Sequence, residues 1–351
     1  MSAMRVLVVD DSALMRRLIG DIIQEQPDLT LAATACNGQD ALKKIETVQP
    51  HVVTLDVEMP LMDGIETLQR IMAAYPLPVI MVSSHTREGS ESTLKALSAG
   101  AVDFIPKPAM SSLEDSIEEL RGILPQKIRA AASIKPEFIT AAKQPSRAAI
   151  KLPPSEQSIP ARALVAIGAS TGGPKALELL FSTLPADLPA AVMLCLHMPP
   201  GFTMAFANRL DMLSPLQVRE AAAGDAVTEG KVLLAPGGFH MKLRGGTIAL
   251  DAGPKVNFVR PAVDVMLESL VDYPHGIVVV ILTGMGKDGA AGAARLKQEK
   301  KDTVILVQDP GTAIIPSMPE AAITSTGCAA TVPLSGMAAE IMRQAVRIAR
   351  R

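Results

Sequence analysis

Residues 4–26 read MRVLVVDDSALMRRLIGDIIQEQ. An apolar run, Arg5–Val9, ends at two aspartates, and apolar residues then recur at spacings of three and four, as they do along one side of a helix. The segment therefore predicts a strand, an acidic turn and an amphipathic helix, which together form the repeating unit of a doubly wound α/β sheet.

The same alternation continues through the first 125 residues. A weaker apolar run lies near Leu29–Ala33, and clearer ones are His51–Leu55, Pro78–Val82 and Ala101–Ile105. Strands that alternate with helices imply a parallel sheet covered on both faces by right-handed crossovers. Five such units predict a flavodoxin-like domain over residues 1–125.

Residues 126–160 differ in character, because prolines interrupt any periodicity and Ala, Ser, Gln and Lys fill the spaces between them. This composition is typical of a linker, here with one short helix near its start. We therefore expect a linker over 126–160 and a second domain over 161–351.

The second domain repeats the α/β pattern. Its strand-like runs are Leu164–Gly168, Ala191–His197, Val232–Ala235, Ile277–Thr283 and Thr303–Gln308. Helical periodicity covers Pro174–Leu184, Phe202–Leu213, Ala262–Val271 and Asp288–Lys300, and a final amphipathic helix ends at Arg351. Val278–Leu282 is apolar at every position, as in a strand buried on both faces. The pattern predicts a second doubly wound, mainly parallel α/β domain.

Composition excludes several classes of protein. The chain has 351 residues, 48% of them hydrophobic, which is enough for two cores. A net charge of −2, no Trp, two Tyr and seven Phe argue against a nucleic-acid binder. Three scattered cysteines suit a reducing compartment and fit neither a disulfide framework nor a zinc site. No apolar run is long enough for membrane insertion, and carboxylates occur too early for a signal peptide, so we expect a soluble, cytoplasmic protein.

Acidic residues follow two strands of the first domain. Asp10 and Asp11 end the first strand and Asp56 ends the third. The carboxyl ends of parallel strands meet at one edge of a sheet, so these side chains are expected to lie together. Clustered carboxylates repel one another and need a cation, and oxygen ligands of this kind suit Mg²⁺.

The same edge carries a hydroxyl and an ammonium group. Ser83 ends the fourth strand and Lys107 follows the fifth. A carboxylate nucleophile, a metal ion and a cation are the groups needed for phosphoryl transfer to an aspartate. An aspartate at a strand end, taken alone, is more often a helix cap than a functional group.

Together these residues resemble the receiver domain of bacterial two-component response regulators, over roughly residues 4–123. The resemblance implies that Asp56 is phosphorylated, that Asp11, Asp56 and the backbone carbonyl of Glu58 bind Mg²⁺, and that Asp10 assists through water. It further implies that Ser83 and Phe104 form the switch pair and that Lys107 contacts the phosphoryl group.

A different chemistry is indicated where the second domain begins. Residues 164–180, LVAIGASTGGPKALELL, predict a strand, a Gly-rich turn and a helix, with Ser170 in a G-x-S-x-G pattern. Such a turn exposes the serine beside a helix N-terminus, which favours developing negative charge. The alternative is a turn that cradles a phosphate, although Lys175 follows Pro174 and so does not complete a Walker motif.

His197 is the best candidate for the base that a nucleophilic serine requires. It closes a strand at the same edge as Ser170, whereas the other histidines lie in the first domain, after a turn or at the opposite edge. Asp288, in the Gly-rich segment after the buried strand, is the carboxylate that could hold the imidazole tautomer. Asp288 could instead, or in addition, be the N-cap of the following helix.

The segments ASTGGP, HMPPGFT, RPAVDVM and LTGMGKDGA resemble the C-terminal domain of bacterial chemotaxis protein-glutamate methylesterases. With the receiver and the linker, the resemblance covers essentially the whole chain. It assigns the roles of nucleophile, base and orienting acid to Ser170, His197 and Asp288. It implies that Met285 supplies a backbone N–H to the oxyanion and that Thr171 lines the site.

Four residues depart from the family pattern. Leu196 replaces a frequent polar residue, Lys287 replaces a common Asn, and Pro316-Ser317, within residues 309–319, stand where an aromatic-Gly pair is usual. The resemblance implies a phosphorylation-activated serine hydrolase that releases methanol from methylated chemoreceptor signalling domains and often deamidates receptor glutamines. Its phosphodonor would be a chemotaxis histidine kinase, Mg²⁺ would serve the receiver alone, and the expected oligomeric state is a monomer.

Two other functions stay open from the residues alone. The second domain could bind a nucleotide or metabolite under phosphorylation control, or it could be an esterase for small metabolites. A response regulator acting on DNA is disfavoured, because the second half has no helix-turn-helix signal and no basic reading face.

Overall fold

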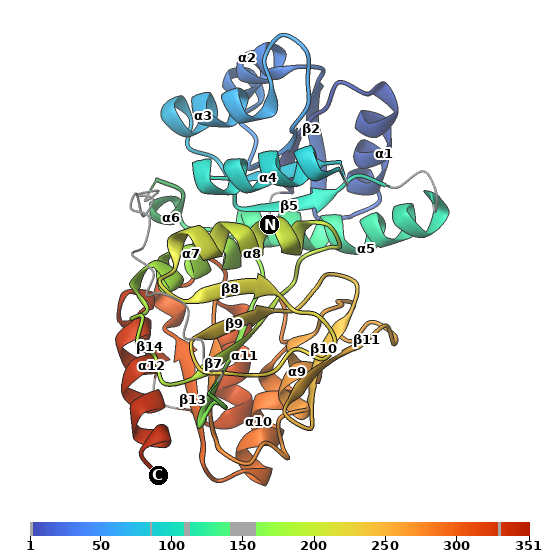
Figure 1. Ribbon diagram of the computed structural model, residues 1–351. Helices are drawn as coiled ribbons and strands as arrows, with labels where there is room; N and C mark the ends of the chain where they lie inside the picture. Colours follow the sequence, from blue (N-terminus) through green and yellow to red (C-terminus); the bar gives the residue numbers. More distant parts are fainter. Residues whose placement is uncertain (1–2, 85, 109–112, 141–158, 329–330) are drawn as a thin grey trace. The chain divides into compact units, whose positions relative to one another are not determined.

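The computed structural model describes residues 3–84, 86–108, 113–140, 159–328 and 331–351. The chain divides into two compact units, Met1–Lys143 and Gln144–Arg351. Each unit is built on its own parallel sheet with helices on both faces (Figure 1), so both domains have the α/β class that the sequence predicts.

The first unit has a five-stranded parallel sheet in the order β2-β1-β3-β4-β5, which is the flavodoxin-like order. Its strands are β1 (Met4–Val9), β2 (Leu29–Ala35), β3 (Val52–Asp56), β4 (Val79–Ser83) and β5 (Asp103–Pro106). Its helices are α1 (Ala13–Gln24), α2 (Gly38–Val48), α3 (Gly64–Ala74), α4 (Arg87–Ala99), α5 (Leu113–Ala132) and α6 (Pro136–Thr140). The α1 and α5 helices pack together, as do α2, α3 and α4.

The first helix forms as its sequence predicts. Ser12 caps its N-terminus by accepting a hydrogen bond from the Met15 N–H. The apolar positions Ile19, Ile22 and Ile23 are fully buried in a core that α1 forms with β1, β2 and α5. The two aspartates before the helix are thereby fixed at the carboxyl edge of the sheet.

The α5 helix passes through the expected start of the linker at residue 126. Ile128 and Ala131 continue its buried face and belong to the same core as α1. This packing carries the helix past Pro125 to Ala132, inside the predicted linker. The rest of the predicted linker, from 141 to 158, lies outside the described residues.

The second unit has a seven-stranded sheet in the order β14-β13-β12-β6-β7-β9-β8, with every strand pair parallel. Its strands are β6 (Ala163–Ala169), β7 (Ala191–Leu196), β8 (Gln217–Glu220), β9 (Lys231–Leu234), β12 (Gly276–Ile281), β13 (Thr303–Gln308) and β14 (Thr331–Val332). A separate antiparallel hairpin pairs β10 (His240–Arg244) with β11 (Thr247–Asp251). The helices are α7 (Gly173–Thr183), α8 (Phe202–Leu213), α9 (Val263–Glu268), α10 (Ala290–Glu299), α11 (Ser317–Thr326) and α12 (Leu334–Ala349).

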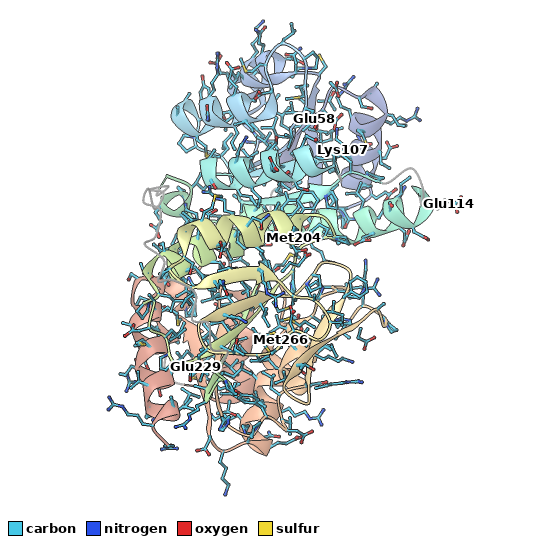
Figure 2. All side chains as sticks on the ribbon, in the orientation of Figure 1. Glu58, Lys107, Glu114, Met204, Glu229 and Met266 are labelled. Atoms are coloured by element: carbon cyan, nitrogen blue, oxygen red, sulfur yellow. The ribbon has the colours of Figure 1, made fainter. Side chains whose placement is uncertain are left out.

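The strand order changes direction at β6. This strand is buried along its whole length and lies between β12 and β7. The strands β7, β9 and β8 lie on one side of it, and β12, β13 and β14 lie on the other. On one face, α9, α10 and α11 pack together around a core that includes Met266 of α9 (Figure 2), while α7 contacts α8 and α12 on the other. In open α/β sheets, ligands bind at the carboxyl edge beside such a reversal.

Several elements were absent from the sequence-based expectation: β8, β14, the β10–β11 hairpin and α11. The predicted helix Ala262–Val271 ends at Glu268, and α10 begins at Ala290 and not at Asp288. In the part of the chain that the structure describes, every helix is too short or too polar to cross a membrane.

Candidate functional sites

The first site is an acidic cluster at the carboxyl ends of β1 and β3. One oxygen each from Asp10, Asp11 and Asp56 lies within 4.8 Å of the others. Asp10 and Asp56 are 1% exposed, whereas Asp11 is open to solvent. The structure thus brings together the three carboxylates that the sequence analysis grouped.

Lys107 is the cation of this cluster. Its Nζ lies 2.7 Å from Asp56 Oδ2 and 3.5 Å from Asp10 Oδ2. Burial raises the pKa of Asp56 to about 6; repulsion from Asp10 adds to the rise, and the bond from Lys107 opposes it. Burial also raises the pKa of Asp10. The single positive charge of Lys107 therefore cannot neutralise the three carboxylates of the cluster.

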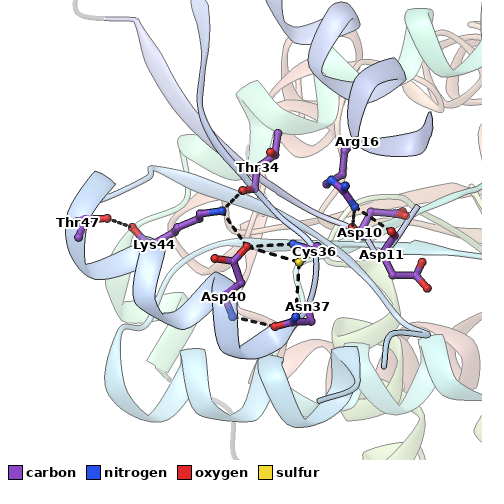
Figure 3. A network of polar contacts seen from close by, with 9 residues as sticks. All are labelled: Asp10, Asp11, Arg16, Thr34, Cys36, Asn37, Asp40, Lys44 and Thr47. Atoms are coloured by element: carbon purple, nitrogen blue, oxygen red, sulfur yellow. Dashed lines mark hydrogen bonds and ion pairs between the residues drawn. The ribbon is translucent and has the colours of Figure 1, made fainter. Parts of the chain in front are cut away.

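The loops hold the carboxylates rigidly. The Arg16 guanidinium donates to the backbone carbonyls of Asp10 and Asp11, at 2.8 and 2.9 Å (Figure 3). The Ser12 N–H donates to Asp10 Oδ1. Within the described residues, the buried Asp10 Oδ2 accepts no hydrogen bond, and its contact with a cation is the 3.5 Å ion pair with Lys107. A rigid set of carboxylate oxygens within 4.8 Å of one another fits Mg²⁺, which prefers such ligands.

The remaining predicted receiver residues lie close by in the fold. Glu58 (Figure 2) follows β3, and its N–H donates to Asp56 Oδ1 at 3.3 Å. Ser83 is fully buried and its hydroxyl donates to the Gly89 carbonyl in α4, 3.1 Å away. Phe104 is also buried, and Lys127 donates to its carbonyl. In this structure the Ser83 hydroxyl is thus engaged with α4.

The second site begins at the turn between β6 and α7. Ser170 directly follows β6 and is half-buried. Gly172 has a φ of +75°, and a Cβ there would lie 2.9 Å from Ile314 Cβ, so both the conformation and the space require glycine. The predicted strand, sharp turn and helix around the serine are therefore present.

His197 is the neighbour of Ser170 across the sheet. Ala169 pairs with Leu196, and the His197 N–H donates to the Ala169 carbonyl at 3.2 Å. The next residues along, Ser170 and His197, therefore leave adjacent strands about 4.8 Å apart. Among the described residues, no hydrogen bond joins the serine hydroxyl to the imidazole, so the structure brings the two together through their backbones.

Asp288 holds the imidazole from the other side. Its Oδ2 lies 2.7 Å from His197 Nε2, and the carboxyl group is 3% exposed. It also accepts hydrogen bonds from the N–H groups of Val263 and Asp264, at 2.6 and 3.0 Å. Burial acts to raise the pKa of Asp288, but His197 and the backbone donors outweigh it, so that the pKa is lowered.

Asp264 and Asp288 cap each other's helices. Asp288 accepts from backbone N–H groups at the start of α9, and Asp264 Oδ1 accepts from those of Gly289 and Gly292 at the start of α10. The alternative in which Asp288 caps its own following helix is wrong, because Gly289 is the N-cap of α10 and Asp264 supplies the acceptor.

Asn257 joins the two carboxylates. Its Nδ2 lies 3.1 Å from both Asp264 Oδ2 and Asp288 Oδ1. Sequence reasoning gave neither Asn257 nor Asp264 a role. A signal existed for Asp264, an acidic residue within the apolar segment RPAVDVM, but Asn257 had none that local sequence could supply.

The turn after β12 closes the site. A Cβ on Gly284 would lie 2.8 Å from Ser170 Cβ, so this backbone rests against the serine. Met285 follows and is half-buried. Thr171 is buried, and its carbonyl accepts a hydrogen bond from the Thr283 hydroxyl at 3.1 Å.

The sequence matches two family models. CheB methylesterase covers residues 165–341, and response regulator receiver domain covers residues 6–118. A protein-glutamate methylesterase/protein-glutamine glutaminase of Symbiobacterium thermophilum is 46% identical over 97% of this chain and 96% of that protein. A protein of the same name from Pyrococcus abyssi is 44% identical over 97% and 93% of the two chains. The crystal structure of the Thermotoga maritima CheB methylesterase catalytic domain is 38% identical and covers 51% of this chain and 97% of that chain, with a TM-score of 0.48.

Proposed function

The chain belongs to the CheB methylesterase family, and we propose that Ser170, His197 and Asp288 carry out its ester hydrolysis. It is a protein-glutamate methylesterase/protein-glutamine glutaminase that carries a receiver domain. The single observation that supports these roles best is the 2.7 Å hydrogen bond between His197 and Asp288, at the edge where Ser170 leaves the adjacent strand.

The geometry suggests which imidazole nitrogen acts as the base. The ionised Asp288 accepts from Nε2–H, which leaves Nδ1 of His197 with its lone pair. Ser170 Oγ attacks the ester carbonyl and its proton passes to Nδ1. Methanol then leaves with that proton, and water hydrolyses the glutamyl-serine ester to regenerate the hydroxyl and release a glutamate carboxylate.

The developing oxyanion needs N–H donors. In the described part of the chain, no acceptor faces the Met285 N–H, and the preceding Gly284 rests against Ser170. We assign this N–H to the oxyanion, with the N-terminus of α7 as a second source of positive potential. Thr171 supports the same wall from its buried position.

In the receiver, we assign Asp56 as the phosphoacceptor. Asp11, Asp56 and the Glu58 carbonyl would hold Mg²⁺, with Asp10 beside them, and the bound ion would neutralise phosphoryl oxygens. Lys107 would contact the phosphoryl group. The switch would be read by Ser83 and Phe104.

The substrates would be methylated chemoreceptor signalling domains, and the phosphodonor a chemotaxis histidine kinase, with the enzyme acting as a cytoplasmic monomer. Residues 1–125 would carry the receiver role and 161–351 the esterase role, joined by 126–160. The unphosphorylated receiver would hinder access of a large protein substrate, and phosphorylation would shift the population towards the open form. Deleting residues 1–150 should then raise basal activity; unchanged or lower activity would contradict this inhibition.

The decisive test is methanol release from methylated chemoreceptor membranes, with and without Mg²⁺ and a small phosphodonor. Ser170→Ala should abolish release, whereas Ser182→Ala should not, because Ser182 lies at the exposed end of α7 and bonds only to its own helix. Donor-stimulated release that needs Ser170 would support both roles. Equal release by wild type and Ser170→Ala would overturn the assignment of the nucleophile.

A further inference from the structure

Asn257 lies in a tight turn between the β10–β11 hairpin and α9. Val256 and Val259 exchange two backbone hydrogen bonds across the turn, at 3.1 and 3.0 Å. Asn257 and Phe258 both have positive φ values, 52° and 65°. Asparagine adopts this conformation more readily than other residues with a Cβ, whereas an aromatic residue seldom does. The surrounding structure therefore holds the turn in place against a local strain.

The anchor of this segment is buried. His240 Nε2 lies 2.9 Å from the Pro254 carbonyl, and His240 Nδ1 accepts from the Ala262 N–H. One imidazole thus fixes the backbone on both sides of the turn. The side chain amide of Asn257 is consequently presented to Asp264 and Asp288 from a rigid frame.

The Asn257 amide lies between two buried carboxylates that repel each other and donates a hydrogen bond to each of them. A carboxamide nitrogen has two hydrogens, and here each is directed to a different carboxylate, 3.1 Å away. Asp264 is 7% exposed and Asp288 3%. Burial, together with repulsion from Asp288, raises the pKa of Asp264 to about 6. The other titratable groups near the pair are His197, bonded to Asp288, buried Cys195 in β7, and His240.

We infer that Asn257 and Asp264 are positioning residues for the hydrolysis. Asn257 orients the Asp288 carboxylate through Oδ1 while Oδ2 holds the imidazole, and Asp264 fixes the amide that does so. Neither residue touches the reacting atoms. The inference rests on the proposed role of Asp288, and it adds a second layer of hydrogen bonds on which the orientation of His197 depends.

Asn257→Gly is the sharpest single variant. Glycine adopts the left-handed backbone freely, so the turn is kept while the amide is lost. We expect kcat for methanol release by the full chain to fall by about 10- to 100-fold, because small misplacements of catalytic groups have effects of that size. The KM for the protein substrate should stay unchanged. Asn208→Ala, on the exposed surface of α8, is the matched control and should leave both constants unchanged.

The pH profile separates positioning from simple folding. Asn257→Asp places a third carboxylate between the two, so kcat should fall most above pH 7 and recover in part near pH 5.5, where a protonated Asp can donate one O–H to Asp288. An unchanged profile shape in this variant would contradict the inference.

The exchanged pair Asn257→Asp with Asp264→Asn gives the strictest test. It restores a donor and an acceptor between positions 257 and 264 but leaves a carboxylate facing Asp288. If Asn257 positions Asp288, kcat stays low in the exchanged pair. Recovery to the wild-type kcat would show that only the bond between 257 and 264 matters, and would overturn the inference.

The proposed function fails separately. If Asp288→Asn retains full activity, the role of Asp288 is wrong, whatever the Asn257 variants do. If Asp288→Asn is inactive while Asn257→Gly, folded by its circular dichroism and melting temperature, keeps the wild-type kcat, the inference alone is wrong.

Discussion

The two units treat a buried carboxylate at the edge of a parallel sheet in opposite ways. Asp56 and Asp288 are almost equally buried, at 1% and 3% exposure. Asp56 receives bonds from Lys107 and the Glu58 N–H beside a second buried carboxylate, and its pKa rises to about 6. Asp288 accepts four hydrogen bonds, including one from His197, and its pKa falls. The hydrogen-bond donors around each carboxylate, and not its burial, therefore decide whether its pKa rises or falls.

The difference matches the proposed roles. A carboxylate that is to be phosphorylated must keep electron pairs uncommitted and lie where a cation is needed. A carboxylate that only orients an imidazole works best when all its lone pairs are engaged, so that it neither moves nor takes up a proton. Replacing either aspartate by asparagine should therefore have different consequences in the two units: loss of activity for Asp288, and a change in the pH dependence of stability for Asp56.

The largest effect is expected for Asp288→Asn. The amide would bring N–H groups against the donors at the start of α9 and would remove the charge that holds Nε2–H, so kcat should fall on the order of 10³- to 10⁴-fold. Methanol release by the full chain measures this. Glu178→Gln, a buried acid of the same unit paired with Arg209, is the control and should retain most activity. Comparable losses in both variants would point to a general structural effect.

The raised pKa of Asp56, opposite in direction to that of Asp288, should make the receiver less stable once Asp56 is ionised. The pKa of Asp56 is about 6 when folded and 3.8 in its ordinary state, so the folded chain binds the proton more tightly. Its ionisation therefore destabilises the receiver by about 3 kcal/mol, absent below pH 3.8 and complete above about pH 6. Asp56→Asn should remove most of this pH dependence, as measured by denaturant unfolding of the receiver transition. The same slope in wild type and variant would contradict it; a smaller slope from Asp10 should persist.

Magnesium should relieve that destabilisation and leave the second unit unaffected. An ion that binds only the folded receiver adds about 2.7 kcal/mol to its stability at a concentration of 100 Kd. The shift should vanish in Asp11→Asn, since the exposed Asp11 belongs to the cluster, and persist in Asp21→Asn, an exposed aspartate of α1. Calorimetry with Mg²⁺ and with a chelator measures both transitions. A shift of the second transition instead would place the ion elsewhere.

Much of this contrast could be predicted from sequence, because its main parts follow directly from strand ends. Val278–Leu282 is apolar throughout and lies in or next to a fully buried strand. The aspartates at the carboxyl ends of β1 and β3 meet at one edge because parallel strands must place them there. His197 could be selected among five histidines by strand direction alone. The buried strand follows from the hydrophobic pattern, and the positions of the aspartates and of His197 follow from the topology of a parallel sheet.

The remaining parts depend on contacts that the local sequence does not encode. Asn257 lies 31 positions before Asp288 in the sequence and meets it from a turn held by His240. The short edge strand Gln217–Glu220 is mostly polar, so it carries no hydrophobic signal. The β10–β11 hairpin did have a signal, since Gly245 and Gly246 both adopt positive φ between alternating segments, a pattern typical of tight hairpins. That turn was predictable and was missed.

The smallest expected effect concerns the switch residues. Ser83→Ala and Ser90→Ala each remove one hydroxyl that donates to a backbone carbonyl of the α4 segment, and both serines are fully buried or nearly so. Each should lower receiver stability by about 1 kcal/mol, the usual net value of such a bond. Only Ser83 follows Val82 at the edge that carries Asp56, so only Ser83→Ala should also reduce the stimulation of methanol release by a small phosphodonor. If both variants respond to the donor as wild type does, the hydroxyl of Ser83 has no part in the switch. If both variants lose the response equally, the packing of α4 as a whole transmits it. The difference between the receiver edge, where Asp56 keeps electron pairs free, and the catalytic edge, where Asp288 is fully hydrogen-bonded, then extends to the helix that packs on β4.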